Sequence, residues 1–202
     1  MNYFFNFYNL YDKITNMSKY FKIVKDNEKS LREKCQIVEN INDDVVLLLN
    51  KMKDYLAASQ DEKIREKYHI REGVGLAAPQ IGKNIRALVV YYQDVDNDGN
   101  TITIDHRLIN PKIVSESVRE VYLSNGEGCL SVDEDHKGYV YRKYKIIVKA
   151  INAETRKEEF ITARGFEAIV LQHEIDHLDG ILYYDRIDKK DPFLVKPDAI
   201  RL

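Results

Sequence analysis

Apolar positions recur at two different periods along the chain, and each period predicts a kind of element. Over residues 43–58 they are spaced three and four apart, as on the buried face of an amphipathic helix. Asn42 or Asp43 is expected to cap the first turn of this helix. Residues 61–68 are mostly charged and predict a short exposed helix directly afterwards.

The next segments have the composition of strands. Residues 85–92 are rich in β-branched and aromatic side chains, and the turn-forming residues 96–99 follow them. A second strand is expected over 112–123, directly after Asn110-Pro111. Both segments are therefore predicted to be strands.

The alternation of apolar and charged side chains is clearest over residues 139–150. Its even positions are apolar except for Arg142, and three of its odd positions carry lysines, at 143, 145 and 149. This period of two predicts a strand with one buried face. A turn over 152–156 leads to a partner strand over 158–163.

Residues 165–178 predict a buried helix with an unusual second half. The first half, from Phe166 to Leu171, is almost wholly apolar. The second half then carries two histidines and two carboxylates. Polar groups buried in this way need partners, and a metal ion together with residues that orient its ligands would supply them.

The stretch His173-Glu174-Ile175-Asp176-His177 is the most informative in the chain. Two histidines four apart on a helix share a face, with Cβ atoms roughly 5–6 Å apart, so both imidazoles can bind one metal ion. Glu174 lies at the edge of that face, where its carboxylate can reach a water on the metal. The pattern is typical of hydrolases in which a metal assists the attack of water on a carbonyl.

A catalytic site of this type usually has three protein ligands and one open position for water. Thermolysin-type proteases take a downstream glutamate as third ligand, but no glutamate follows Glu174. Metzincins need a histidine where this chain has Tyr183. The sequence therefore argues against both protease classes. The candidates for the third ligand are Cys129, His69, His106 and His136. The three histidines lie beside charged segments or in an acidic loop, and we interpret them as surface residues. Cys129 follows glycines that allow close backbone approach, and a thiolate is a strong ligand, so Cys129 is favoured.

The segment Gly73-Val74-Gly75-Leu76-Ala77-Ala78 matches a dinucleotide-binding fingerprint. That fingerprint requires a helix directly after it, whereas Pro79 and Gly82 interrupt the chain there. We therefore interpret the glycines as room for a second backbone, such as a peptide substrate paired as an extra strand.

Composition narrows the class of protein. The 202 residues are 44% hydrophobic and 32% charged, as expected of one globular domain. A formal net charge of −2 argues against nucleic-acid binding, and no apolar run approaches the roughly 18 residues of a membrane span. The two cysteines, Cys35 and Cys129, do not form a disulfide framework, which favours a reducing compartment.

We expect a single catalytic domain over residues 19–202, preceded by an N-terminal extension over 1–18. The apolar spacing of the extension fits one side of a short helix, and it lacks the features of a secretory signal. We interpret the extension in one of two ways. It is either an extra helix docked on the domain, or the result of an upstream start, with the working start at Met17.

Three motifs occur together and in one order: Gly73-Val74-Gly75-Leu76-Ala77-Ala78-Pro79-Gln80, Glu127-Gly128-Cys129-Leu130-Ser131 and Gln172-His173-Glu174-Ile175-Asp176-His177-Leu178. With them the chain resembles peptide deformylase over about residues 21–191. The segment 59–71, the run Cys129-Leu130-Ser131-Val132-Asp133 and the short C-terminal tail resemble the type II branch of Gram-positive-like bacteria. The resemblance implies an α+β fold with antiparallel β-sheets around a buried metal-binding helix. It also implies a hydrolase that removes the N-formyl group from the N-terminal formyl-methionine of nascent polypeptides.

The resemblance assigns roles to individual residues. The implied metal ligands are Cys129, His173 and His177. Glu174 would act as general base, with the Gln80 amide and the Leu130 backbone N–H as donors to the oxyanion. The peptide path and the methionine pocket would be lined by Val74, Gly75 and Ile169. The residues implied to orient the ligands are Glu127 and Asp176, with Arg142 as the partner of Glu127.

The implied cofactor is one divalent metal ion, with Fe²⁺ as the native ion and Zn²⁺ or Ni²⁺ as alternatives. The implied partners are formyl-methionyl peptides and nascent chains, with a transient ribosome contact. We expect a monomer in the bacterial cytoplasm that binds neither nucleic acid directly nor membrane. The residues alone leave two other functions open, a metallopeptidase and a catalytically silent module that binds nascent N-termini through the same groove.

Overall fold

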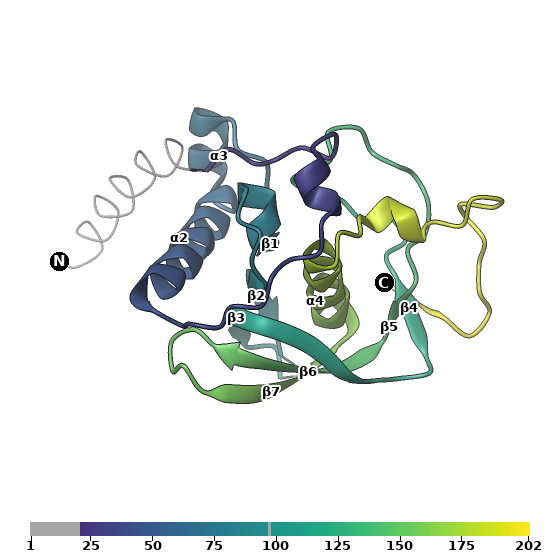
Figure 1. Ribbon diagram of the computed structural model, residues 1–202. Coiled ribbons are helices and arrows are strands. Elements are labelled where there is room, and N and C mark those ends of the chain that lie inside the picture. Colours follow the sequence, from purple (N-terminus) through teal and green to yellow (C-terminus); the bar gives the residue numbers. More distant parts are fainter. Residues whose placement is uncertain (1–20, 97) are drawn as a thin grey trace.

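The computed structural model describes residues 21–96 and 98–202. The predicted helix within residues 1–18 lies outside these residues. In the described part, the main sheet has five antiparallel strands in the order β1-β2-β3-β6-β7 (Figure 1). Their bounds are Gly75–Ala77, Ala87–Val95, Thr101–Glu116, Lys145–Asn152 and Glu158–Arg164. A smaller sheet has the order β5-β4-β8, from Arg142–Lys143, Glu120–Tyr122 and Ile200–Arg201.

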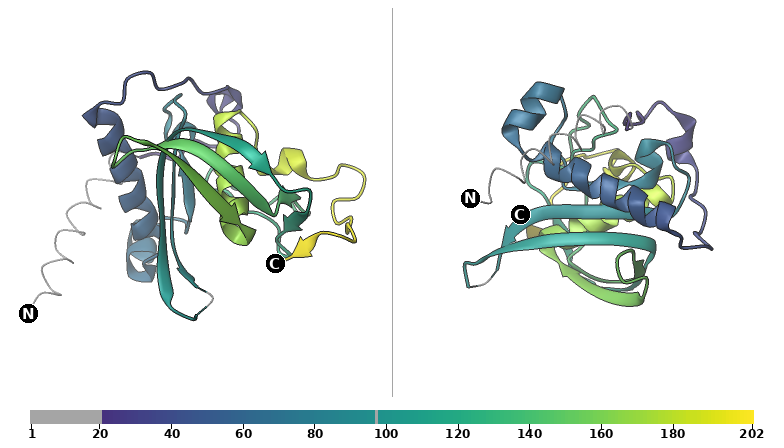
Figure 2. Two further views of the ribbon diagram at one scale, coloured as in Figure 1. Left: turned by 90° about the horizontal axis from the view of Figure 1, so that it is seen from below. Right: turned by 90° about the vertical axis from the view of Figure 1, so that its left-hand side faces the viewer.

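Helices cover both faces of the main sheet. The α-helices are α2 (Asp43–Ser59), α3 (Glu62–Tyr68) and α4 (Gly165–Leu178). Short 3₁₀ helices are η1 (Lys29–Arg32), η2 (Ala78–Ile81) and η3 (Tyr183–Arg186). Figures 1 and 2 show α2 and α4 on opposite sides of the central strands.

Strand β2 shows why two helices are needed. Its residues 87–90 are all buried, so both faces of the strand must be covered. Leu88 and Val90 belong to the core cluster that contains α4, whereas Ala87 and Val89 belong to the cluster that contains α2. Alternate side chains of one strand therefore enter two separate cores.

The helices form where local signals predict them. Asn42 caps α2, because its side chain accepts a hydrogen bond from the Val45 backbone N–H at 3.1 Å. Asp61 caps α3 in the same way through Ile64. The bounds of α4 are those predicted from the sequence, and residues 168–178 of this helix are all buried.

The strand predicted over 112–123 was wrong in its bounds. Strand β3 begins at Thr101 and ends at Glu116, and β4 is separate. Asn110 has a φ of 53°, and the register of β3 against β6 shifts between Ile109 and Lys112. Pro111 therefore lies at a bulge, where a strand tolerates a proline, and it does not mark the start of the strand.

The glycine segment is not followed by a long helix. Strand β1 leads into η2, which has four residues, and the chain turns at Gly82 with a φ of 73° before β2. The structural context of a dinucleotide-binding turn is therefore missing from this segment. Strand β1 is an edge strand of the main sheet instead.

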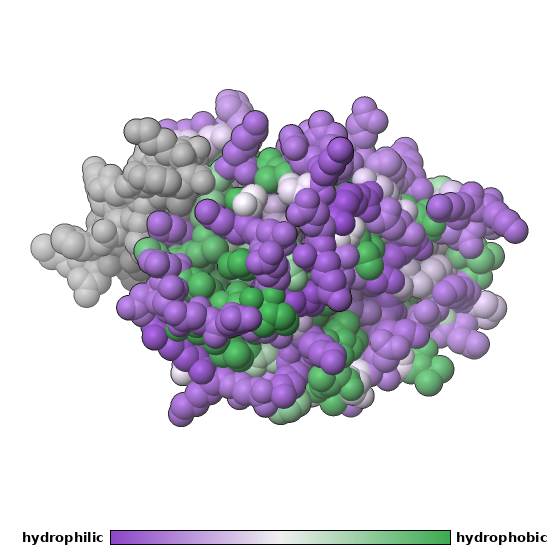
Figure 3. Space-filling model, viewed as in Figure 1, coloured by the Kyte–Doolittle hydropathy of each residue, from purple (hydrophilic) through white to green (hydrophobic). Residues whose placement is uncertain are grey.

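The many charged residues of the chain, 32% of the sequence, are reflected in a largely polar surface (Figure 3). Figure 3 shows that polar and charged side chains cover most of one face, with smaller apolar groups between them. Within residues 21–96 and 98–202, no helix has the length and apolar character to cross a membrane.

Candidate functional site

Helix α4 presents two histidines to one cysteine. The side-chain ligand atoms of Cys129, His173 and His177 all lie within 4.8 Å of one another, and all three residues are buried. Cys129 Sγ is 3.3 Å from His177 Nε2. The two histidine rings meet edge to face with centroids 5.0 Å apart, as their spacing of one helical turn predicts.

This arrangement fits a metal ion. Bonds of about 2.0–2.3 Å in tetrahedral geometry place two ligand atoms roughly 3.5 Å apart, close to the observed separation of Cys129 Sγ and His177 Nε2. Burial alone raises the pKa of the Cys129 thiol, but the adjacent His177 and His173 outweigh it and hold that pKa well below its ordinary value. Cys129 is therefore poised as a thiolate, the form that binds metals. Zn²⁺ and Fe²⁺ both accept one sulfur and two imidazole ligands.

The second nitrogen of His173 has a carboxylate partner. Its Nδ1 atom lies 2.8 Å from Glu127 Oε2, which turns the other nitrogen toward Cys129. Glu127 in turn accepts two hydrogen bonds of 2.8 Å from Arg142 Nε and Nη2. The side chains of Glu127 and Arg142 are 4% and 2% exposed, so this ion pair is shielded from solvent. A carboxylate in this position fixes the orientation of a ligating imidazole.

The same ion pair predicts a change in acid stability. Burial raises the pKa of Glu127, but its bonds with Arg142 and His173 outweigh that effect and lower the pKa from 4.5 to about 2. Glu127 therefore stabilises the fold above about pH 4.5, and this contribution is lost as the pH falls toward 2. For Glu127→Gln we expect a lower free energy of unfolding at neutral pH and a weaker decline across this window, measured by urea unfolding with a chelator present. Parallel pH profiles for the variant and the wild type would contradict the assignment.

Glu174 is buried beside the three ligands. Burial raises its pKa to about 7 against the opposing effect of His173 and His177. In the described part of the chain, Glu174 Oε2 and His177 Nδ1 are buried without a hydrogen-bond partner. Unpaired buried polar atoms are costly, and Glu174 lines the cavity, so its unpaired oxygen suits a polar guest there. A bound cation would lower the pKa of this carboxylate.

Gly75 of β1 provides the space that Glu174 occupies. A Cβ atom built on Gly75 would lie 2.2 Å from Glu174 Oε1 and 2.7 Å from its Cδ. The sequence interpretation of this glycine as room for a second backbone is therefore incomplete. Its missing side chain first of all admits the carboxylate.

Gln80 is fixed in orientation by the backbone. The Ala77 N–H donates to Gln80 Oε1 at 2.7 Å. Because an N–H can only donate, the amide oxygen must face Ala77 and the NH₂ group must face the site. Gln80 Nε2 then lies 3.5 Å from Cys129 Sγ and 3.2 Å from Ser131 Oγ.

A cavity of about 420 Å³ opens onto this centre. Its lining includes the predicted substrate residues Val74, Gly75 and Ile169, together with Gln80, Leu130 and Glu174. Phe166 and Val170 of α4 complete an apolar wall. Neither residue was predicted as part of the site, although Phe166 lies three positions before Ile169 on the same face of the predicted helix.

The three excluded histidines lie away from the Cys129 group. His69 is exposed and ends α3 with a left-handed backbone. His136 is exposed, with its ring 4.1 Å from that of Tyr184. The interpretation of His106 as a surface residue was wrong, because its side chain is 18% exposed and pairs with Glu167 Oε1 at 2.8 Å.

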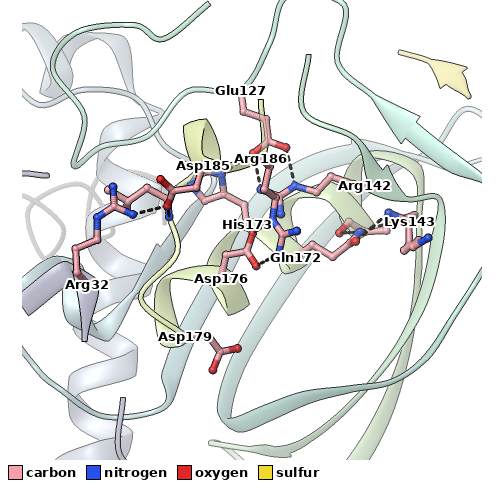
Figure 4. A network of polar contacts seen from close by, with 12 residues as sticks. Arg32, Glu127, Arg142, Lys143, Gln172, His173, Asp176, Asp179, Asp185 and Arg186 are labelled. Atoms are coloured by element: carbon pink, nitrogen blue, oxygen red, sulfur yellow. Dashed lines mark hydrogen bonds and ion pairs between the residues drawn. The ribbon is translucent and has the colours of Figure 1, made fainter. Parts of the chain in front are cut away.

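Two charged residues complete the surroundings of α4. Asp176, predicted to orient a ligand, contacts Arg142 and Arg186. Within the described residues, no side-chain hydrogen bond joins Asp176 to Cys129, His173 or His177. Arg186 of η3 was missed, because nothing in the sequence pattern links it to a position ten residues earlier. Figure 4 shows this network around α4.

Comparison with known proteins relates this site to one family. The family model described as polypeptide deformylase matches residues 20–193. The peptide deformylase of Lacticaseibacillus casei is 46% identical over 179 residues, covering 88% of this chain and 95% of that protein. The peptide deformylase of Staphylococcus epidermidis is 42% identical over 181 residues, covering 89% and 97%.

Solved structures of peptide deformylases are also similar to this chain. A probable peptide deformylase from Synechococcus phage S-SSM7 is 34% identical with a TM-score of 0.65, covering 82% of this chain and 99% of that one. The peptide deformylase of Ehrlichia chaffeensis is 30% identical with a TM-score of 0.66, covering 84% and 89%. The predicted α+β fold around a metal-binding helix is thus confirmed, and the chain belongs to the polypeptide deformylase family.

Proposed function

We propose that this chain is a metal-dependent hydrolase that removes the N-formyl group from the N-terminal formyl-methionine of nascent polypeptides. The observation that carries the proposal is the buried Glu174 carboxylate, with one unpartnered oxygen, beside the Cys129, His173 and His177 group at a cavity. These are the parts that metal-assisted hydrolysis of an amide requires: a metal centre, a base and a site for the carbonyl. Family membership specifies which amide.

The proposed metal ligands are Cys129, His173 and His177, holding one divalent ion. We propose Fe²⁺ as the native ion, with Zn²⁺ or Ni²⁺ as functional substitutes, because the donor set accepts all three. When bound, such an ion acts as a Lewis acid and lowers the pKa of water. Glu127, supported by Arg142, holds the His173 ring in the ligating orientation.

Glu174 would move the proton. Its Oε2 atom has no hydrogen-bond partner among the described residues, and Glu174 lines the cavity, so the carboxylate would take a proton from the attacking water. The same atom would then return the proton to the amine that leaves. A group with a pKa near neutral performs both steps well. Burial raises the pKa of Glu174 above its ordinary value, whereas a bound cation would lower it again.

Two donors would stabilise the oxyanion. The Gln80 Nε2 atom is directed at the centre by the Ala77 contact. The Leu130 backbone N–H, adjacent to Cys129, is the second proposed donor. Losing one such donor typically lowers the rate by about 10²–10³-fold.

The edge of β1 offers a path for a peptide. Val74 O accepts a hydrogen bond from Tyr91 N across the sheet at 2.9 Å. Because backbone groups alternate along a strand, the amide and carbonyl of Gly75 point away from β2, toward the open edge. We propose that the substrate pairs there and inserts methionine toward Ile169. A peptide deformylase from Acinetobacter baumannii, 26% identical with a TM-score of 0.64, is solved with Met-Ala-Ser bound, which supports a path of this kind.

We further propose that nascent chains are the physiological substrates, through a transient ribosome contact, and that the protein acts as a monomer in the bacterial cytoplasm. Residues 19–202 would form the single catalytic domain, and residues 1–18 would form an N-terminal extension.

A deformylation assay tests the proposed function. The protein is purified without oxygen and its metal content is measured. The same sample is then assayed with a formyl-Met peptide and with a peptide that tests cleavage of an internal peptide bond. We expect release of formate from the first and no cleavage of the second. Cleavage of the internal peptide would favour a metallopeptidase, and bound metal without turnover would favour a silent binding module.

Cys129→Ser tests the ligand set. A serine hydroxyl is a much poorer ligand than a thiolate, so we expect lower metal occupancy and, with Co²⁺ bound, loss of the sulfur-to-metal charge-transfer absorption. The matched control is Cys35→Ser, because Cys35 is also buried but lies outside the metal group. Unchanged metal content and absorption in Cys129→Ser would remove Cys129 from the ligand set.

A further inference from the structure

A series of alternating charges leads from a metal-binding histidine to the protein surface. His173 contacts Glu127, and Glu127 is bound through both oxygens by Arg142. Arg142 also contacts Asp176, which receives a second guanidinium from Arg186. Arg186 Nε and Nη2 each lie 2.5 Å from a different oxygen of Asp176 (Figure 4). Such two-point contacts fix both partners in orientation.

Arg186 is the outermost member of this series. Its side chain is 41% exposed, whereas that of Asp176 is 9% exposed, so its guanidinium reaches inward to a buried carboxylate. The element that carries Arg186 is held from its other side as well. Asp185 of η3 pairs with Arg32 of η1 and accepts the Leu182 backbone N–H at 2.8 Å.

Charge balance shows what Arg186 contributes. Glu127 and Asp176 supply two negative charges, and Arg142 and Arg186 supply two positive charges. Without Arg186, the single guanidinium of Arg142 would face two buried carboxylates, one of which would lack its full set of partners. An uncompensated buried charge is strongly unfavourable. Arg142 would then be drawn toward Asp176, which weakens its two contacts with Glu127.

We propose that Arg186 is a positioning residue for His173, acting through Asp176, Arg142 and Glu127. The inference rests on the proposed function, because it concerns the same metal centre. Among the described residues, the hydrogen bonds of the Arg186 guanidinium go to Asp176, and Arg186 is not part of the cavity lining. Its effect on the metal would therefore pass through the orientation of the His173 ring. Residues that orient a ligand in this way typically contribute 10–100-fold to metal affinity or activity.

The test compares Arg186→Gln with the wild type, both loaded with metal. We expect kcat for a formyl-Met peptide to fall by about 10-fold with KM unchanged, and the visible absorption of the Co²⁺-loaded variant to shift. Arg186→Lys should recover part of the lost kcat, because it restores the charge without the two-point contact. The matched control is Arg156→Gln, since Arg156 is 48% exposed and pairs with Asp43, outside this network. This control should behave as the wild type.

Three results would overturn the inference. The first is an Arg186→Gln variant with wild-type kcat and Co²⁺ absorption. The second is a kcat that falls only as the folded fraction falls, with the absorption unchanged, since that is a purely structural role. The third concerns the double variant Arg186→Gln with Asp176→Asn. If its kcat is much lower than that of Asp176→Asn alone, Arg186 acts through a residue other than Asp176. A wild type without deformylation would refute the proposed function instead, and the Co²⁺ absorption would still test Arg186.

Discussion

Glu174→Ala is expected to lower kcat for deformylation by about 10²–10⁴-fold, the usual contribution of a positioned general base. Metal content should stay at the wild-type level, because Glu174 is not a member of the Cys129, His173 and His177 group. The variant should also keep its fold. The wild-type carboxylate is buried with an unpartnered oxygen, so its removal deletes an unfavourable burial rather than a favourable contact.

Metal analysis, steady-state kinetics and thermal unfolding of the same preparation check these three expectations. Glu167→Ala is the matched control, since Glu167 lies on the same helix, is half-buried and pairs with His106 away from the ligands. This control should retain its turnover. A Glu174→Ala variant with near-normal turnover would refute the role of Glu174 as base. Loss of metal along with turnover would show that Glu174 acts on the metal site instead.

The local parts of this site could be predicted from the sequence because they depend on helical spacing. His173, Glu174 and His177 lie within one turn of α4, and the apolar run before them already indicates that the helix is buried. Cys129 was placed beside them by its ligand chemistry alone, and the structure brings it within 3.3 Å of His177. These inferences needed no knowledge of the strand order.

Parts that depend on tertiary structure were predicted less well. Arg142 was noted only as the polar exception in the alternation predicted over residues 139–150. The structure divides that segment into β5, which carries Arg142, and β6, which belongs to the main sheet. Arg186 gave no signal in the sequence, because it is partly exposed and its partner is set by how η3 folds back on α4. The course of β3 was misread for a similar reason. A proline usually marks the edge of a strand, and only the pairing of β3 with β6 shows that Pro111 occupies a bulge.

Gly75→Ala should lower both kcat and stability. The sequence suggested that this glycine makes room for a peptide backbone, whereas the structure shows that it makes room for the Glu174 carboxylate. The backbone of Gly75 is not among those with positive φ, so alanine meets no conformational barrier there. The added Cβ, however, would lie within 2.8 Å of three atoms of the Glu174 side chain. The carboxylate must move, and a displacement of about 1 Å at a reacting group can cost 10²-fold in rate. We expect a loss of kcat of this order and a destabilisation of about 1–3 kcal/mol from overpacking.

A second mutation separates this steric mechanism from a role of Gly75 in peptide binding. In a Glu174→Ala background the three clashing atoms are gone, so Gly75→Ala should no longer destabilise the fold. Gly73→Ala provides the comparison within the same segment, because its Cβ would meet a leucine methyl of Leu130 at 2.9 Å, which can rotate away. Urea unfolding of the wild type, the two single variants Gly75→Ala and Glu174→Ala, and the double variant gives the coupling directly. If Gly75→Ala destabilises both backgrounds equally, Glu174 is not the reason for the glycine, and the open edge of β1 becomes the better explanation.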